Sequence, residues 1–354
     1  MSVPLYGALR DSLRYGYAVG RVRVLQTRVF GTGTYERLVD APTFAEQRKI
    51  LSDTVYGRYL EGAETADDVE AALSAALEGF YGFLDVAELP EPVVRFFRVR
   101  HDYANLRAVL KARALAVPEG EMLVGLGTVP LDVIAGPTDA LPPLLREVAE
   151  HVIRATAPAG DAVTREERAE ASVAATLLDP MSTVALIDEI VEAALFAELR
   201  RVARAARSAF LRGLATLLID VANAKTVLRA RRRGLPPVAL GGILQAGGSF
   251  GVAWLEERYS SPLEDLARAI AVLPGLRGVI AEDLLDPAAL DVSTDNLVVR
   301  YLRRARVAAI GPDPVIAYVF AREAEVVAVR TLLIGKLAGL TEAALRRRLR
   351  DRYV

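Results

Sequence analysis

The chain has 354 residues, with 44 Lys or Arg against 45 Asp or Glu, and this balance argues against a nucleic-acid-binding surface, which normally carries a basic excess. Cysteine is absent, and only His101 and His151 could supply an imidazole. We therefore expect no disulfide, no thiolate nucleophile, no metal site and no cofactor. The length favours two or three packed units over one core.

The order of helix signals along the chain predicts an all-α fold. Apolar residues make up 52% of the chain and aromatic residues only 6%, a mixture rich in Ala, Leu and Val that favours helices. Thr65 with Asp68 predicts a helix start, and Gly79 the end of that helix. The segment 171–217 has apolar residues at helical spacing. Further starts are predicted at Asp179-Pro180, at Ser261-Pro262 with Glu264, at Asp286-Pro287 and at Asp313-Pro314.

The most apolar long stretch, residues 238–255, is long enough to span a membrane. It contains Gln245, Ser249 and five glycines, so we expect it to be buried or in a loop. The N-terminus lacks the pattern of a secretory signal peptide. The sequence therefore predicts a cytoplasmic protein with no transmembrane segment of its own.

An internal repeat is the most informative feature of the sequence. Residues 102–113 read DYANLRAVLKAR and residues 220–231 read DVANAKTVLRAR, with seven of twelve positions identical and two Arg/Lys exchanges. The offset of 118 residues is one third of the chain. A weaker third copy, EVVAVRTLLIGKLAG, occupies residues 325–339. We therefore predict three similar helical domains, with boundaries at 1–117, 118–236 and 237–354, around a pseudo-threefold axis.

The repeated helix has distinct faces. Asp102 and Asn105 share one face, Asp220 and Asn223 share the equivalent face, and Glu325 takes the place of the aspartates in the third copy. One interpretation is that the acids and amides bridge neighbouring helices inside the bundle while the bases are solvated. The other is that the bases line a partner-binding surface. Both can hold, because they concern different residues; the basic edges are formed by Arg107, Lys111, Lys225, Arg229 and Arg330.

Five segments, in order, resemble the C subunit of the archaeal and bacterial V-type (A-type) ATPases, called the d subunit in eukaryotes. They are YGYAVGRVRVLQTRVF at 15–30, LSDTVYGRYL at 51–60, RHDYANLRAVLKAR at 100–113, DVANAKTVLRARRRGLP at 220–236 and PDPVIAYVFAREAEVVAVRTLLIGKLAGL at 312–340. The resemblance implies a funnel of three similar helical domains. It also implies a non-catalytic rotor subunit, one copy per complex, on the cytoplasmic face of the membrane. Its partners would be the central shaft of the catalytic head and the membrane proteolipid ring.

The alternative is a stand-alone helical enzyme or nucleotide-binding module that uses the turn at Gly31 or the pair Gly247-Gly248. Neither turn follows a predicted strand and precedes a helix as a dinucleotide site requires. Gly335-Lys336 lacks the upstream glycine of a phosphate-binding loop. His101 and its neighbour Asp102 point in different directions on a helix, which is poor geometry for a triad. We therefore predict no catalytic residue.

Overall fold

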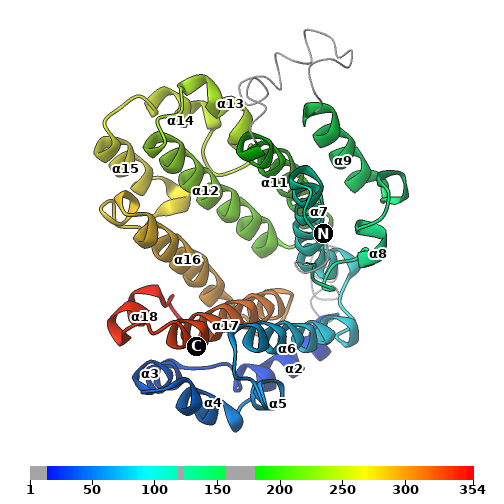
Figure 1. Cartoon of the computed structure of the whole chain (residues 1–354), viewed down its shortest axis with the longest axis vertical. Helices are drawn as coiled ribbons and strands as arrows, with labels where there is room; N and C mark the ends of the chain where they lie inside the picture. The colour runs from blue at the N-terminus through cyan, green and yellow to red at the C-terminus, as the bar shows by residue number, and fades with distance from the viewer. Residues whose placement is uncertain (1–13, 119–122, 157–179) are drawn as a thin grey trace, which may run out of the picture. The chain divides into compact units, whose positions relative to one another are not determined.

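The computed structural model describes residues 14–118, 123–156 and 180–354 and contains helices, turns and loops but no strand within those ranges (Figure 1). The chain divides into two compact units. The first unit is Met1–Pro90, Ser208–Leu214 and Leu276–Val354, and the second is Glu91–Arg207 and Ala215–Gly275. The all-α prediction is thus confirmed for the part of the chain that is described.

The first unit collects helices from the two ends of the chain. They are α2 (Gly16–Gln26), α3 (Thr32–Asp40), α4 (Phe44–Ser52), α5 (Gly57–Leu60), α6 (Ala66–Val86), α16 (Pro287–Arg303), α17 (Asp313–Leu337) and α18 (Glu342–Arg348), with 3₁₀ turns at Asp283–Leu285 and Arg304–Val307. The long helices α6 and α17 lie side by side (Figure 1).

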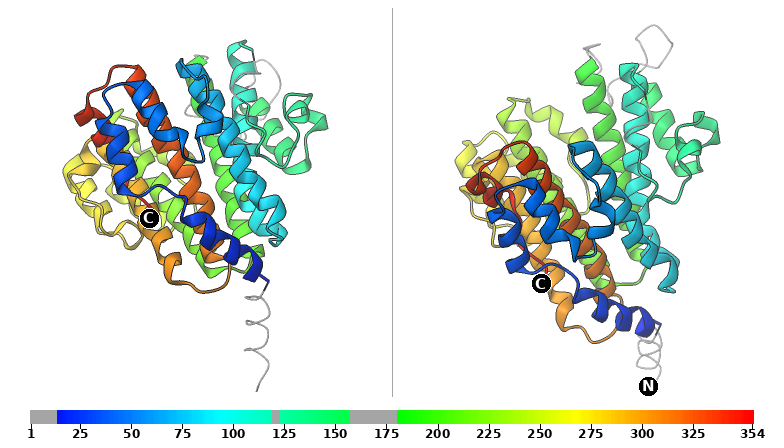
Figure 2. Two further views of the ribbon diagram at one scale, coloured as in Figure 1. Left: turned by 90° about the horizontal axis from the view of Figure 1, so that it is seen from below. Right: turned by 60° about the horizontal axis from the view of Figure 1, so that its bottom comes forward.

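The second unit is built from the middle of the chain. Its helices are α7 (Glu91–Leu115), α8 (Leu131–Ile134), α9 (Pro143–Thr156), α11 (Pro180–Ala205), α12 (Ala209–Arg232), α13 (Leu240–Ile243), α14 (Val252–Arg258) and α15 (Leu263–Ala271), with 3₁₀ turns at Thr138–Ala140, Pro237–Ala239 and Pro274–Leu276. The first turns of α12 and the end of the last 3₁₀ turn belong to the first unit. The long helices α7 and α11 pack along each other (Figure 2).

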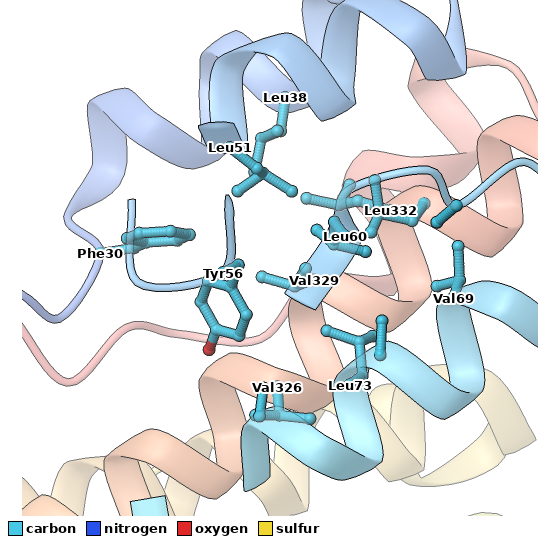
Figure 3. Close-up of a cluster of buried hydrophobic side chains, with 14 of the residues drawn as sticks. Phe30, Leu38, Leu51, Tyr56, Leu60, Val69, Leu73, Val326, Val329 and Leu332 are labelled. Atoms are coloured by element: carbon cyan, nitrogen blue, oxygen red, sulfur yellow. The ribbon is translucent and has the colours of Figure 1, made fainter. Parts of the chain in front are cut away.

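The core of the first unit forms where α3 to α6 pack on α17. Figure 3 shows Leu60, Leu73, Val326 and Val329 gathered between these helices, and all four side chains are almost completely buried. Full burial of one such side chain contributes about 1.5–3 kcal/mol relative to exposure. This packing joins the beginning of the chain to its last long helix.

The start of α6 follows the sequence signal, but its end does not. Thr65 and Asp68 start the helix as predicted, and the structure shows that they do so through a capping box. The helix was expected to close at Gly79 but continues to Val86, so that prediction is wrong. A Cβ at Gly79 would lie 2.3 Å from the Tyr59 hydroxyl. The glycine therefore allows α5 to approach α6 and does not terminate the helix.

A capping residue followed by proline was also predicted to start three other helices of the described ranges, and the predicted cap is found at only one of them. Asp286 caps α16 as predicted, because its Oδ2 accepts a hydrogen bond from the Ala289 N–H at 2.7 Å. At α15 the expected cap by Ser261 is wrong: Pro262 occupies the N-cap position and no side chain caps the helix. At α17, Asp313 is the first helical residue and not the cap. Asp179 lies outside the described residues.

The apolar stretch 238–255 consists of short helices joined by a loop, with Leu240 and Leu255 buried. No helix in the described ranges has the length and hydropathy needed to cross a membrane. Further upstream, the helical segment 171–217 is interrupted after α11, where Arg207 has a φ of +54°. The part of that segment before Pro180 lies outside the described residues.

Candidate functional site

The first repeated helix, α7, binds the loop that follows it. Asp102 Oδ1 accepts hydrogen bonds from the N–H groups of Thr128 (2.7 Å) and Val129 (3.0 Å), and Oδ2 accepts one from the Thr128 hydroxyl (2.6 Å). Asn105 donates to the Val124 carbonyl (2.8 Å) and accepts from the Val124 N–H (3.0 Å). Asp102 and Asn105 are buried, and the loop supplies the partners that buried polar groups require.

The second repeated helix, α12, does the same at equivalent positions. Asp220 Oδ1 accepts a hydrogen bond from the Ser249 N–H at 2.7 Å. Asn223 donates to the Gln245 carbonyl at 2.8 Å and accepts from the Gln245 N–H at 2.7 Å. The two loop partners, Gln245 and Ser249, have the same separation as Val124 and Thr128 in the first copy. We call each such carboxylate, with the loop groups bound to it, a carboxylate latch.

Both of these latches require a glycine in the loop. A Cβ at Gly127 would lie 2.1 Å from Asp102 Oδ1, and one at Gly248 would lie 2.2 Å from Asp220 Oδ1. Only a residue without a side chain lets the backbone come this close to the carboxylate. The glycine followed by a hydroxyl residue, Gly127-Thr128 and Gly248-Ser249, is therefore part of the repeat. It was not among the predicted repeat positions, although comparison of the segments after the repeated helices would have found it.

The third latch, on α17, is built differently. Glu325 Oε2 accepts the Phe30 N–H at 2.5 Å, and Oε1 accepts the Tyr56 hydroxyl at 2.8 Å. The Arg322 guanidinium donates a hydrogen bond to Glu325 Oε1, which makes a buried ion pair. The position of Asn105 and Asn223 is taken by Ala328. In this copy, an arginine and a tyrosine hydroxyl donate to the carboxylate in addition to one backbone N–H.

Burial dominates the electrostatics of all three latches. It raises the pKa of the Asp102, Asp220 and Glu325 carboxyls. Hydrogen bonds from the loops oppose this rise at each site, and the charge of Arg322 opposes it at Glu325. The three carboxylates therefore accept hydrogen bonds from groups within this chain, and these hydrogen bonds fix the loops in place.

The basic edge of α7 faces the acidic edge of α11. Lys111 Nζ lies 2.6 Å from Asp188 Oδ1, and Arg107 Nε lies 3.5 Å from the same oxygen. On the same face of α11, burial raises the pKa of Glu192, while the charges of Arg107 and Arg229 lower it. Arg107 and Lys111 are half-buried and Arg229 is exposed. The structure thus brings these three bases to α11.

The same ion pair recurs at the third copy. Arg330 Nε on α17 lies 2.8 Å from Glu70 Oε2 on α6. Arg330 is the equivalent of Arg107, and Glu70 precedes Asp188 by 118 residues, which is the offset of the repeat. The bases were predicted from the sequence but these acids were not. Lys225, at the same repeat position on α12, is half-buried.

The two turns considered for nucleotide binding each donate a backbone N–H to one of the latch carboxylates. The N–H of Phe30, just before Gly31, donates to Glu325, and the N–H of Ser249, just after Gly248, donates to Asp220. These amides point to internal carboxylates. Within the described ranges, no group of three or more His, Asp or Glu side chains could hold a metal ion.

The sequence profile of the ATP synthase (C/AC39) subunit family matches residues 18–348. The chain belongs to this family. As a family member, it is similar to the C subunit of the V-type ATP synthase of two Thermus thermophilus strains. Each is 27% identical over 335 residues, which cover 93% of this chain and 96% of the relative.

Two further relatives extend the similarity to other branches of the family. The C subunit of the V-type sodium ATPase of Enterococcus hirae is 23% identical over 344 residues, 94% of this chain and 97% of the relative. The C subunit of the A-type ATP synthase of Methanocaldococcus jannaschii is 22% identical over 363 residues, 95% of this chain and 86% of the relative. The resemblance seen in the sequence is confirmed. The matched residues include all three latches of this C/AC39 family member.

Proposed function

We propose that this chain is a non-catalytic central-stalk subunit of a V-type or A-type rotary ATPase. It would act as a socket that couples the central shaft of the soluble catalytic head to the membrane proteolipid ring. Torque would pass through it during proton or sodium transport or ATP synthesis. The observation that carries the proposal is the family match over residues 18–348, together with relatives that match over nearly their full length and are named as C subunits of such ATPases.

The three repeats, at 1–117, 118–236 and 237–354, would form a closed funnel with pseudo-threefold symmetry. Two equivalent helix pairs support this arrangement. The pair α7 and α11, with Arg107 on Asp188, joins repeat one to repeat two. The pair α17 and α6, with Arg330 on Glu70, joins repeat three to repeat one. These are two of the three contacts that a cyclic set of three repeats requires.

Partner binding would use the basic edges. Ion pairs with acids of this chain are formed by Arg107, Lys111 and Arg330. Arg229 is the exposed residue of the five, and so it is the base best placed to meet an acidic partner surface. Charge complementarity at such an edge acts mainly on the association rate and on the choice of partner.

The experiment that tests the role is capture of the tagged chain from gently solubilised membranes of its own host, followed by mass spectrometry. Recovery of proteolipid, shaft and catalytic-head subunits is the expected result. A clean monomer, under conditions that keep the rest of the ATPase intact, would refute the socket role. It would also reopen the alternative of a stand-alone nucleotide-binding module or enzyme.

The contribution of the basic edge is tested in the same preparation. Arg229→Glu should reduce the recovery of shaft or ring subunits, and more so at low salt than at high salt. Arg347→Glu, an exposed arginine on α18 outside the basic edges, is the matched control. Equal recovery with both variants would show that Arg229 is not a contact, even if the socket role holds.

A further inference from the structure

A cavity in the first unit has a lining unlike that of any other site described above. It has a volume of about 600 Å³ and lies among α2, α5, α6, α17 and the turn after α4. Its lining residues include four arginines and no carboxylate: Arg21, Arg28, Arg58 and Arg322. We propose that this arginine pocket binds a phosphate-bearing ligand.

The charge of the lining distinguishes this cavity from a cavity of the second unit. That cavity, between α9 and α11, carries Glu147, Glu189 and Glu198 against Arg201 and His151. Its acids and bases are mixed, as at an ordinary surface. In the arginine pocket, Arg322 pairs with Glu325, which is not a lining residue and is also bound by Phe30 and Tyr56. The remaining three guanidiniums face the cavity with no acid among its lining residues.

Arg322 provides a buried donor for the ligand. Its side chain is 3% exposed, and its Nη1 donates to Glu325 and to the Arg28 carbonyl. Its Nε is buried and has no hydrogen-bond partner within the described residues. An unsatisfied buried N–H is costly to the folded state. An oxygen of a bound anion would satisfy it.

Three of the four arginines lie over or beside aromatic rings. The Arg322 guanidinium lies over the Phe80 ring at 4.1 Å, and the Arg21 guanidinium is 5.6 Å from the Phe83 ring. Arg58 stacks on Tyr59 at 4.5 Å. A guanidinium stacked on a ring can still donate its N–H groups to a ligand. It loses little side-chain entropy when the ligand binds, because the ring already fixes the orientation of the guanidinium.

The donors of the pocket indicate which ligand fits. Ser52 and Thr54 also line it, but their hydroxyls already donate to the carbonyls of Lys49 and Leu51. The arginine N–H groups are therefore the main donors, and they suit a ligand with several acceptor oxygens and more than one negative charge. Phosphate meets this requirement, and arginine binds it through two parallel hydrogen bonds. The volume admits more than one phosphoryl group, and Phe80 and Phe83 offer an apolar side to an organic phosphate.

Titration calorimetry on the purified full-length chain tests the proposal with inorganic pyrophosphate and with ATP. A parallel vesicle flotation compares phosphatidylcholine vesicles with vesicles that also contain phosphatidylglycerol. Saturable binding of pyrophosphate or ATP would identify a soluble phosphate ligand. Binding only to the anionic vesicles would identify a lipid headgroup. Either result, if it depends on the pocket arginines, supports the proposal.

Dependence on the pocket is measured with Arg58→Gln and Arg28→Gln. Each should weaken binding by about tenfold or more, because each removes a charge-assisted hydrogen bond. Arg322 is left intact, since it also holds Glu325. Arg347→Gln, on the exposed face of α18, should bind as the wild type does. Unfolding curves of all variants show whether the fold is kept.

The proposal is overturned if no probe binds saturably, or if the folded Arg58→Gln and Arg28→Gln variants bind as tightly as the wild type. It does not depend on the socket role. Failure of the membrane capture experiment would leave it standing, and loss of phosphate binding would leave the socket role standing.

Discussion

The latches of the second unit and the latch of the first unit fix their loops by different chemistry. Asp102 and Asp220 are bound by backbone N–H groups and hydroxyl residues of the loop, with an asparagine one turn further along the helix. Glu325 is bound by one backbone N–H, one tyrosine hydroxyl and a buried arginine. The carboxylate is the common element of the repeat, and the groups that compensate its burial differ.

The origin of the difference can be read at single positions. Arg322 is three residues before Glu325, and the equivalent positions are Val99 and Leu217, which are buried and apolar. The first unit therefore has a buried cation where the second has aliphatic packing. A buried ion pair adds little net stability, but removal of one partner is strongly destabilising. The latch of the first unit should thus respond more strongly to mutation.

The largest expected effect is that of Glu325→Ala. It leaves Arg322 charged, buried and without its carboxylate, and should lower the free energy of unfolding by about 3–5 kcal/mol. Asp102→Ala leaves only the hydrogen-bond donors of the loop without an acceptor. It should lower the free energy of unfolding by about 1–3 kcal/mol. Urea unfolding followed by far-UV circular dichroism measures both.

A second substitution sharpens this comparison. Arg322→Leu, added to Glu325→Ala, introduces the residue type found at Leu217 and removes the stranded charge. It should restore part of the stability lost in the single variant. If the double variant is no more stable than Glu325→Ala, the buried charge is not the cause of the loss, and the two kinds of latch do not differ in the way described.

An intermediate effect is expected for Gly248→Ala in the second unit. The new Cβ would lie 2.2 Å from Asp220 Oδ1, so the loop must move and the Ser249 hydrogen bond is lost. The expected cost is about 1–3 kcal/mol in the free energy of unfolding. Gly251→Ala is the matched control, because no atom lies within 4 Å of a Cβ there. Equal thermal unfolding midpoints for the two variants would contradict the close approach.

The smallest expected effect is on pH dependence. Burial raises the pKa of Asp220 above its usual value of 3.8. The folded state therefore binds this proton more tightly than the unfolded state, and the stability present below the usual pKa is lost as the pH rises through the raised pKa. Asp220→Asn keeps an oxygen for the Ser249 N–H and carries no charge. Its free energy of unfolding should fall less than that of the wild type between about pH 4 and about pH 7.

The control for this titration is Asp53→Asn, an exposed aspartate at the end of α4. Its unfolding free energy should follow that of the wild type across the same pH range. A wild-type pH profile that Asp220→Asn leaves unchanged would show that this carboxyl does not contribute to it.

The sequence predicted what depends on local pattern. The helices, the repeat and the family follow from periodicity, from the shared positions Asp102 and Asp220, and from the five segments that resemble the family. It could not predict contacts that depend on approach between distant segments. The local pattern around Gly79 predicts a helix end, and this prediction is wrong. The glycine makes room for Tyr59, a residue that comes close to it only in the folded structure. The acids Glu70 and Asp188 were not predicted because their helices lack the sequence identity of the repeated ones.

The hydrogen bond from Phe30 to Glu325 also has a consequence for synthesis of the chain. It joins residues 295 positions apart, and the core around Leu60 and Leu73 is completed by α17. During translation, α3 to α6 emerge early but cannot bury this apolar surface until α17 has left the ribosome. Long-range pairing of this kind folds slowly and leaves apolar surface exposed meanwhile. The apolar faces of α3 to α6 therefore stay exposed to water, and to other nascent chains, for most of the time that the chain takes to be synthesised.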